Sequence, residues 1–223
     1  MLPAALVFDF DGTLVDTETP EYEGVRRVWA EHGHAYPLER WLPYVGTIYA
    51  APWVDELSAA VGRRLDAHTL RTRVHEHRLA LVDTIAPRPG VLDLLAAAAD
   101  ADVPVAIASN APADWIEAHL DRLAMAQHFV AVVSVDRVER PKPHPEPYLT
   151  ACALLGADPA HSIGFEDSVA GLTAAVAAGL YTVAVPGPMS DGHDLGFADE
   201  HRASLAEVTL VGLGEAVARR RAA

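Results

Sequence analysis

Short apolar runs alternate along most of the chain with segments in which apolar residues recur at helical spacing. Five runs have the length of buried strands, and they cover residues 5–10, 103–109, 129–135, 162–165 and 181–185. Helical patterns lie near residues 90–100, 112–124, 145–155 and 168–178. Because strands that alternate with helices form parallel sheets with crossover helices on both faces, the pattern predicts an α/β fold.

Residues 17–85 depart from this alternation. They contain no convincing strand pattern, whereas their apolar positions repeat at helical spacing. The repeating positions are Val25, Val28 and Trp29, then Val54, Leu57 and Val61, then Leu70, Val74 and Leu81. We therefore expect an all-helical domain over residues 17–85, inserted into an α/β core that is formed by residues 1–16 and 86–223.

Composition limits the possible ligands. The 223 residues and 51% hydrophobic content are enough for one sizeable core with an inserted subdomain. A formal net charge of −14 argues against a nucleic acid or an anionic membrane as partner, because either would be repelled. The insert carries eight arginines and ten acidic residues, so most of the surplus acidity lies outside it. A small anionic ligand then needs locally placed positive charge.

Cysteine content and the N-terminal residues favour a cytoplasmic protein. The single cysteine, Cys152, cannot form an internal disulfide, and its helical setting favours a small buried hydrophobic side chain. No basic, apolar leader precedes the first strand pattern. Residues 171–189 carry no charge, which approaches the length of a membrane helix. Gly179 and Pro186 within them favour instead a helix, a glycine stop and a buried strand.

Two aspartates end the first strand pattern, in the stretch VFDFDGTLVDTE of residues 7–18. If the strand continues, Asp9 and Asp11 point the same way near its carboxyl end, where open α/β sheets bind ligands. Two adjacent carboxylates repel each other, and a cation between them relieves that repulsion. Gly12 and Thr13 then turn the chain. The alternative is an aspartate that only caps a loop.

Three later stretches place polar residues where a converging site needs them. Ser109 and Asn110 offer donors to an oxyanion, although such a pair also begins helices. Lys142 is the only lysine beside sixteen arginines, and its alternative is a solvated loop lysine. Glu166 and Asp167 are hard oxygen ligands suited to Mg²⁺, although acidic residues are also common at helix N-termini.

Together these stretches resemble the haloacid dehalogenase superfamily, in its phosphatase and phosphomutase branch with a helical cap. The family's four motifs match, in order, Asp9 to Thr13, Ser109, Lys142, and the pair Glu166 and Asp167. The resemblance covers nearly the whole chain, and it implies a Rossmann-like core with residues 17–85 as the cap domain.

The resemblance implies an enzyme that hydrolyses a small phosphorylated metabolite such as a sugar phosphate. Asp9 is then the nucleophile that forms an aspartyl-phosphate, and Asp11 is the acid and base. The implied Mg²⁺ ligands are Asp9, the Asp11 carbonyl, Glu166 and Asp167. The implied phosphate-binding residues are Gly12, Ser109, Asn110 and Lys142.

In the insert, Arg71, Arg73 and Arg78 could meet the distal groups of a substrate, although a solvated helix face is the simpler interpretation. Trp41 and Tyr44 are candidates for a substrate loop.

Three other functions remain open at this point. A phosphomutase resembling beta-phosphoglucomutase shares every core motif, but family mutases resemble one another in a cap lysine and a histidine after the first motif. This insert has no lysine, and Glu21 falls about where that histidine would be. A phospho-aspartate signalling domain needs no cap, and a non-catalytic relative need not keep all four motifs. The sequence does not determine the oligomeric state, and a monomer is compatible with it.

Overall fold

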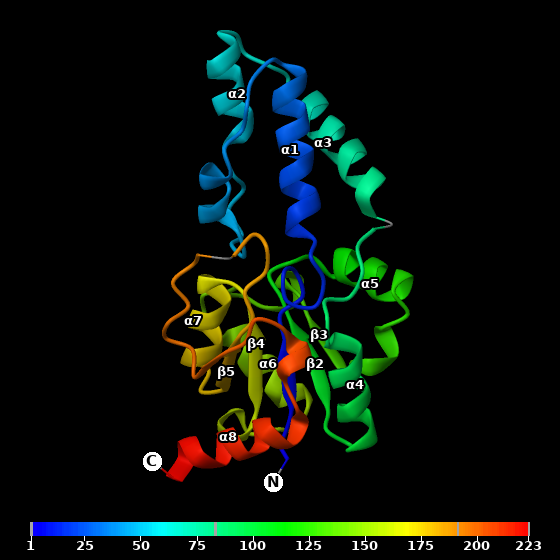
Figure 1. Ribbon diagram of the computed structural model, residues 1–223, viewed down its shortest axis with the longest axis vertical. Helices are drawn as coiled ribbons and strands as arrows, with labels where there is room; N and C mark the ends of the chain where they lie inside the picture. The colour runs from blue at the N-terminus through cyan, green and yellow to red at the C-terminus, as the bar shows by residue number, and fades with distance from the viewer. Residues whose placement is uncertain (1, 83, 191, 223) are drawn as a thin grey trace.

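The computed structural model describes residues 2–82, 84–190 and 192–222, and its lower part is built around one parallel sheet (Figure 1). The strand order is β3-β2-β1-β4-β5-β6. The strands are β1 Leu6–Phe8, β2 Val105–Ala108, β3 Ala131–Val133, β4 Ile163–Glu166, β5 Tyr181–Ala184 and β6 Glu200–His201. Every pairing between them is parallel, so the expected α/β fold with a parallel sheet is confirmed.

Helices cover both faces of the sheet. They are α4 Val91–Asp100, α5 Ala113–Arg122, α6 Glu146–Leu154, α7 Val169–Ala177 and α8 Leu210–Ala222. Short 3-10 turns lie between the elements: η3 Ala126–His128, η4 Val135–Arg137, η5 Pro159–His161 and η6 Leu205–Glu207. The patterns near the first four helices are confirmed, whereas β6 and α8 were not expected.

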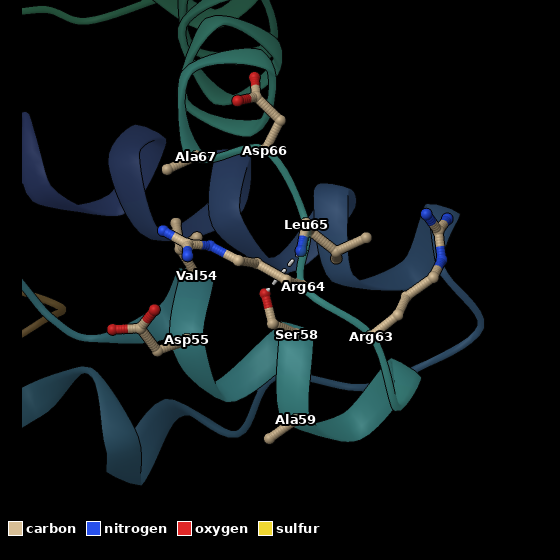
Figure 2. Close-up of a pocket in the computed structure, with 9 residues that line it drawn as sticks. All are labelled: Val54, Asp55, Ser58, Ala59, Arg63, Arg64, Leu65, Asp66 and Ala67. Carbon is tan, nitrogen blue, oxygen red and sulfur yellow. Dashed lines mark hydrogen bonds between the residues drawn. The ribbon is translucent and has the colours of Figure 1, made fainter.

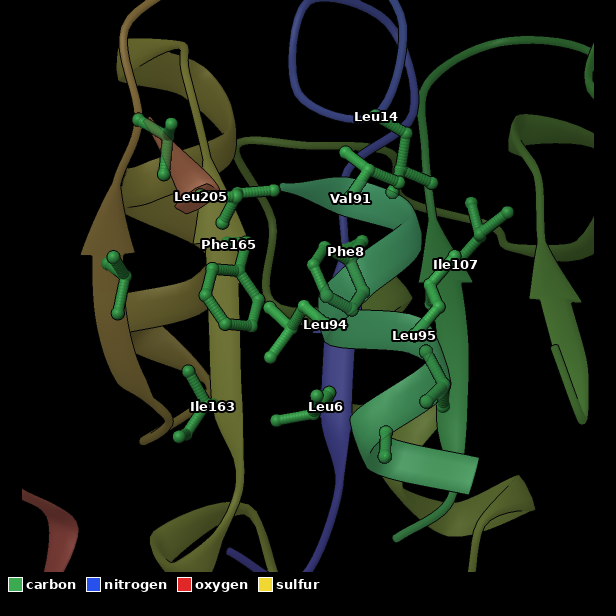
Figure 3. Packing of buried hydrophobic residues seen from close by; sticks show 14 of the residues in the cluster. Leu6, Phe8, Leu14, Val91, Leu94, Leu95, Ile107, Ile163, Phe165 and Leu205 are labelled. Carbon is green, nitrogen blue, oxygen red and sulfur yellow. The ribbon is translucent and has the colours of Figure 1, made fainter. Parts of the chain in front are cut away.

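The alternation of side chains along β1 divides the core in two. Leu6 and Phe8 face the cluster that also contains Leu94 and Leu95 of α4, where Phe8 stacks on Phe165 of β4 (Figure 3). Val7 faces the other way, toward buried residues of α6 and α7. Cys152 is buried in this second cluster, as its helical setting predicts.

Residues 17–85 form helices beyond the carboxyl ends of the strands (Figure 1). Their elements are α1 Glu18–Glu31, η1 Leu38–Arg40, η2 Leu42–Tyr44, α2 Trp53–Val61 and α3 Ala67–Val82. They bury most of another hydrophobic cluster, which includes Val25, Trp29 and Leu57 and also Met189 from outside the segment. Gly24 lets α1 approach α3 closely, because a Cβ there would lie 3.0 Å from the Val74 carbonyl oxygen. In the described residues of this segment no strand is present, as expected.

The uncharged stretch 171–189 folds as expected. It contains most of α7, then Gly179 with a φ of +86°, then β5. Among the described residues, no helix combines the length and apolar content that crossing a membrane requires.

Candidate active site

Four of the motif residues meet at the carboxyl edge of the sheet. Asp9 follows β1, Glu166 ends β4, Asp167 follows it, and Lys142 lies in the loop between η4 and α6. β1 lies between β2 and β4, where the order of the strands reverses direction. This is the edge at which open α/β sheets bind ligands.

Lys142 joins two of the carboxylates. Its side chain is 2% exposed, and Nζ donates hydrogen bonds of 2.6 Å to Asp9 Oδ1 and of 2.6 Å to Glu166 Oε1. Burial alone would lower the pKa of the ammonium, but the two carboxylates outweigh it and raise the pKa. Lys142 therefore stays charged at the point where the sheet edge is most acidic.

Glu166 is completely buried and is bound on several sides. Besides Lys142, the Tyr148 hydroxyl donates to Oε1 at 2.7 Å. The Ser168 hydroxyl donates to Oε2 at 3.2 Å. Its carboxylate also packs onto Gly171, where a Cβ would overlap it. Glu166 is thus fixed by the protein itself.

Asp167 has weaker partners. Ser190 Oγ donates to Oδ2 at 2.9 Å, and Thr13 Oγ1 donates to Oδ1 at 3.3 Å. Burial, with the nearby Glu166 charge, raises the pKa of Asp167 to about 7. The glycine at position 12 leaves room for this carboxylate, since a Cβ at Gly12 would overlap Oδ2.

These carboxylates suit a metal ion. Asp9, Glu166 and Asp167 each offer an oxygen, and the three oxygens lie within 4.8 Å of one another. Burial and the two neighbouring acids raise the pKa of Asp9 well above its usual value, although Lys142 opposes them. Three buried carboxylates face one ammonium, so a divalent cation would balance the surplus charge. The donor set consists of hard oxygens and fits such an ion.

Asp11 does not join that group through its side chain. β1 ends at Phe8, so the alternation that would align the two aspartates does not extend to Asp11. Its Oδ1 instead accepts hydrogen bonds from the Thr17 hydroxyl and, at 2.9 Å, from Trp115 Nε1. Burial raises the pKa of Asp11, and both hydrogen bonds oppose the rise. The expectation that both carboxylates share one cation site through their side chains was wrong.

Ser109 and Asn110 lie at the same edge, and the side chain of Asn110 is already engaged. Ser109 is buried directly after β2, and its Oγ accepts from the Ala111 amide at 3.0 Å. The Asn110 side chain accepts from the Lys142 amide at 2.9 Å and donates to the Lys142 carbonyl at 3.2 Å. It also reaches the Gly46 carbonyl at 3.4 Å. Asn110 thus fixes the lysine loop and links it to the insert.

Gly12 does not offer a free amide either. Its N–H donates to the Val15 carbonyl at 2.7 Å. Its carbonyl accepts from Arg88 Nη1, which also donates to the Val185 carbonyl at 2.8 Å. The turn after Asp11 is therefore anchored from both sides.

Sequence reasoning missed several residues around the site. Glu18 faces Asp11 and Asp167, and burial together with these charges raises its pKa to about 8. Trp115, Tyr148 and Arg88 contact the motif residues from elsewhere in the fold. Apart from the position of Glu18 beside the first motif, no sequence pattern marks them, because their contacts exist only after folding.

A cavity of about 390 Å³ within the insert opens beside Glu18. Of the candidates proposed from the sequence, Trp41, Tyr44, Arg71 and Arg78 line it. Arg73 does not, because it pairs with Glu31 and Glu76 on the outside.

A second cavity of about 700 Å³ lies between α2 and the start of α3 (Figure 2). Its arginines Arg63 and Arg64 point apart, and Ser58 Oγ accepts from the Leu65 amide at 3.1 Å (Figure 2). None of the motif residues lines it, and its two arginines do not converge on one point where a phosphate could bind.

A family model described as haloacid dehalogenase-like hydrolase matches residues 3–179. The chain belongs to this family. Its relative YhcW of Bacillus subtilis is 38% identical, over 92% of this chain and 94% of that protein. The fructose-1-phosphate phosphatase YqaB of Escherichia coli is 32% identical, over 82% of this chain and 96% of that protein.

Solved structures agree with the fold. CbbY from Rhodobacter sphaeroides, in complex with phosphate, has a TM-score of 0.74 and 28% identity, covering 95% of this chain and 99% of that one. The beta-phosphoglucomutase of Clostridium difficile has a TM-score of 0.77 over the full length of both chains. At 20% identity the latter shows the shared fold alone.

Proposed function

We propose that this hydrolase is a Mg²⁺-dependent phosphatase that cleaves a small phosphomonoester, a sugar phosphate or a similar metabolite, through an aspartyl-phosphate on Asp9. The observation that carries the proposal is the buried group of Asp9, Glu166 and Asp167 with Lys142 between two of its members. The relatives named as phosphatases support the same reaction class.

Asp9 is the proposed nucleophile. One of its oxygens forms a bond to phosphorus while the bond from phosphorus to the alcohol oxygen breaks, and the alcohol oxygen keeps the electron pair. Lys142 holds Oδ1 at 2.6 Å, so the attacking carboxylate is oriented before substrate arrives. Its ammonium also balances charge that gathers on the transferring group.

Asp11 is the proposed acid and base. Its carboxyl gives a proton to the departing alcohol oxygen, and its carboxylate later takes a proton from the water that attacks the aspartyl-phosphate. The raised pKa of Asp11 favours the protonated form that the first step needs.

Asp9, Asp167 and the Asp11 carbonyl are the proposed ligands of Mg²⁺, with Glu166 assisting. When bound, the ion supplies positive charge against the phosphoryl oxygens. Glu166 is bound to Lys142, Tyr148 and Ser168, so its proposed part is mainly to fix the lysine.

Ser109, Lys142, the Asn110 amide and the turn at Gly12 are the proposed phosphate cradle. Ser109 is buried at the end of β2, and Asn110 holds the lysine loop. Because the side chain of Asn110 is engaged, its proposed contact with phosphate is through the backbone.

We further propose residues 1–16 and 86–223 as the catalytic core and residues 17–85 as its cap, in a cytoplasmic protein. Support for the cap comes from Gly46, where a Cβ would overlap Ser168 beside the carboxylates. This contact closes the site on one side, which turnover requires and a phospho-aspartate signalling domain does not.

The insert favours hydrolysis over phosphate transfer between two positions of a sugar. Glu21 forms an ion pair of 3.0 Å with Arg78, so the arginine's charge is already balanced. The insert also contains no lysine. A second phosphate would therefore meet little uncompensated positive charge there.

The test is incubation with sugar phosphates, polyol phosphates, phosphoglycolate and nucleotides, followed by phosphorus NMR. With Mg²⁺ we expect inorganic phosphate from at least one ester, and none after exhaustive chelation. Full activity after chelation would contradict the metal requirement. Conversion of beta-glucose 1-phosphate to glucose 6-phosphate, with a trace of the bisphosphate present, would contradict the choice of hydrolysis.

A further inference from the structure

Asp11 receives two hydrogen bonds on one oxygen. The Thr17 hydroxyl and Trp115 Nε1 both donate to Oδ1, the indole at 2.9 Å. A carboxylate oxygen has about two acceptor positions, so Oδ1 is filled and a proton on Asp11 belongs on Oδ2. Fixing Oδ1 also fixes the direction in which Oδ2 points.

Trp115 is confined by the residues around its ring. Arg78 lies over the ring, with its guanidinium carbon 4.6 Å from the ring centroid. The buried His119 packs against the ring edge-on, with a centroid distance of 4.3 Å. A cation over an indole face is attracted to it, most strongly where water is partly excluded.

Arg78 comes from a different part of the chain than Trp115. It lies on α3 of the insert, whereas Trp115 lies on α5 beside the sheet. Glu21 accepts from Arg78 Nη1 at 3.0 Å, and Nη2 lies 2.9 Å from His75 Nδ1. A series of contacts therefore runs from the insert through Arg78 and Trp115 to Asp11.

We infer that Trp115 is a positioning residue that directs the proton-bearing Oδ2 of Asp11, and that Arg78 of the insert holds its ring in place. The inference rests on the proposed function, since it needs Asp11 as the proton donor. In that step the ester bond from phosphorus to oxygen breaks, a bond from phosphorus to Asp9 forms, and the leaving oxygen takes the proton from Oδ2.

The way in which the rate depends on the leaving group distinguishes a positioning role of Trp115 from a merely structural one. An alkoxide needs the proton as it leaves, whereas p-nitrophenolate leaves with little protonation. The measurement is the rate of phosphoenzyme formation by rapid acid quench at saturating ester. The aryl probe is p-nitrophenyl phosphate, and the alkyl probe is fructose 1-phosphate or, if it reacts faster, the best sugar phosphate of the screen.

Trp115→Phe keeps an aromatic ring, although a smaller one, and removes the indole N–H. We expect the alkyl rate to fall about 10- to 100-fold and the aryl rate less than about threefold. Trp29→Phe is the matched control, because Trp29 is buried in the insert and its Nε1 has no partner among the described residues. It should leave both rates unchanged.

Arg78→Met tests the second half of the inference and remains informative if Trp115→Phe fails to fold. As a single substitution it should lower the ratio of the alkyl rate to the aryl rate about threefold. Added to Trp115→Phe, it should not change that ratio further. Equal losses with both esters, or an unchanged ratio in both variants, would overturn the inference. A wild type that forms no phosphoenzyme from either ester would instead overturn the proposed function.

Discussion

At the scale of single residues, the two acids of the fourth motif have different environments. Glu166 is bound to Lys142, Tyr148 and Ser168 and is fully buried. Among the described residues, the side chain of Asp167 accepts hydrogen bonds from two hydroxyls, those of Thr13 and Ser190, and burial raises its pKa to about 7. We therefore expect Glu166 to stabilise the fold. We expect the Asp167 carboxylate to reduce stability when no metal is bound, and to contribute to metal binding.

Glu166→Gln and Asp167→Asn test this difference, because each replaces a carboxylate with an amide of the same shape. Removing one partner of a buried ion pair typically costs about 3–5 kcal/mol, so Glu166→Gln should lower the free energy of unfolding by about 3 kcal/mol. Without metal, Asp167→Asn should leave the free energy of unfolding unchanged or raise it, and it should raise the Mg²⁺ concentration for half-maximal activity by about tenfold or more.

The pH dependence gives Asp167 a second readout, measured by denaturant unfolding with chelator present. A carboxyl whose pKa is raised on folding keeps its proton in the native state while the unfolded chain has lost it. Its contribution to stability therefore falls as pH rises from about 4 through about 7. Asp167→Asn should remove that part of the fall. Equal Mg²⁺ requirements in the two variants would contradict the assignment.

The residues of the site were partly predictable. The position of the site follows from the parallel topology, which brings residues after the strands to the carboxyl edge of the sheet. Residues that follow apolar runs or prolines in the sequence were expected there: Asp9, Lys142, Glu166 and Asp167. The direction of Asp11 was not predictable, because it depends on the strand ending at Phe8. Trp115 reaches Asp11 from 104 residues away in the chain, which no local pattern encodes.

At the scale of elements, strand and helix positions followed from apolar periodicity, but their ends did not. The first strand pattern covers residues 5–10, whereas β1 is Leu6–Phe8. Phe10 is apolar and fully buried but lies outside the strand. The apolar pattern in the sequence is therefore longer than the strand, because it reports burial and not hydrogen bonding between strands. β6 has two residues and lies at the sheet edge, too short to produce a periodic signal.

Gly90 shows how one element depends on another. It precedes α4 with a φ of +86°, and a Cβ there would overlap the backbone of Ala206 in η6. Gly62 has a similar φ of +76°, and a Cβ there would meet nothing within 4 Å. An alanine at either position would have to adopt a strained left-handed backbone. Only the alanine at position 90 would also overlap a neighbouring backbone.

Gly90→Ala and Gly62→Ala therefore form a matched pair. The left-handed backbone should cost each variant about 1 kcal/mol of unfolding free energy. Gly90→Ala should lose about 1–3 kcal/mol more, because α4 must move away from η6. Thermal and urea unfolding measure both. A loss in Gly62→Ala as large as that in Gly90→Ala would contradict this account of how α4 packs.

At the scale of the whole molecule, a net charge of −14 opposes an anionic substrate. Two features of the site oppose this repulsion: the buried Lys142, and three carboxylates that lie close enough together to bind a cation. The insert adds Arg71 to the cavity beside that group, whereas the charge of Arg78 in the same cavity is balanced by Glu21. Local positive charge, rather than the overall field, then has to hold the phosphate.

The central claim is that Asp9 carries the phosphoryl group. The most direct test is to mix the enzyme with Mg²⁺ and its best phosphomonoester, quench with acid within one turnover, and map the modified peptide by mass spectrometry. We predict a phosphate on Asp9 in the wild type, and neither phosphate nor turnover in Asp9→Asn. A phosphate on another residue, or an Asp9→Asn variant that keeps more than a few per cent of the activity, would contradict the claim.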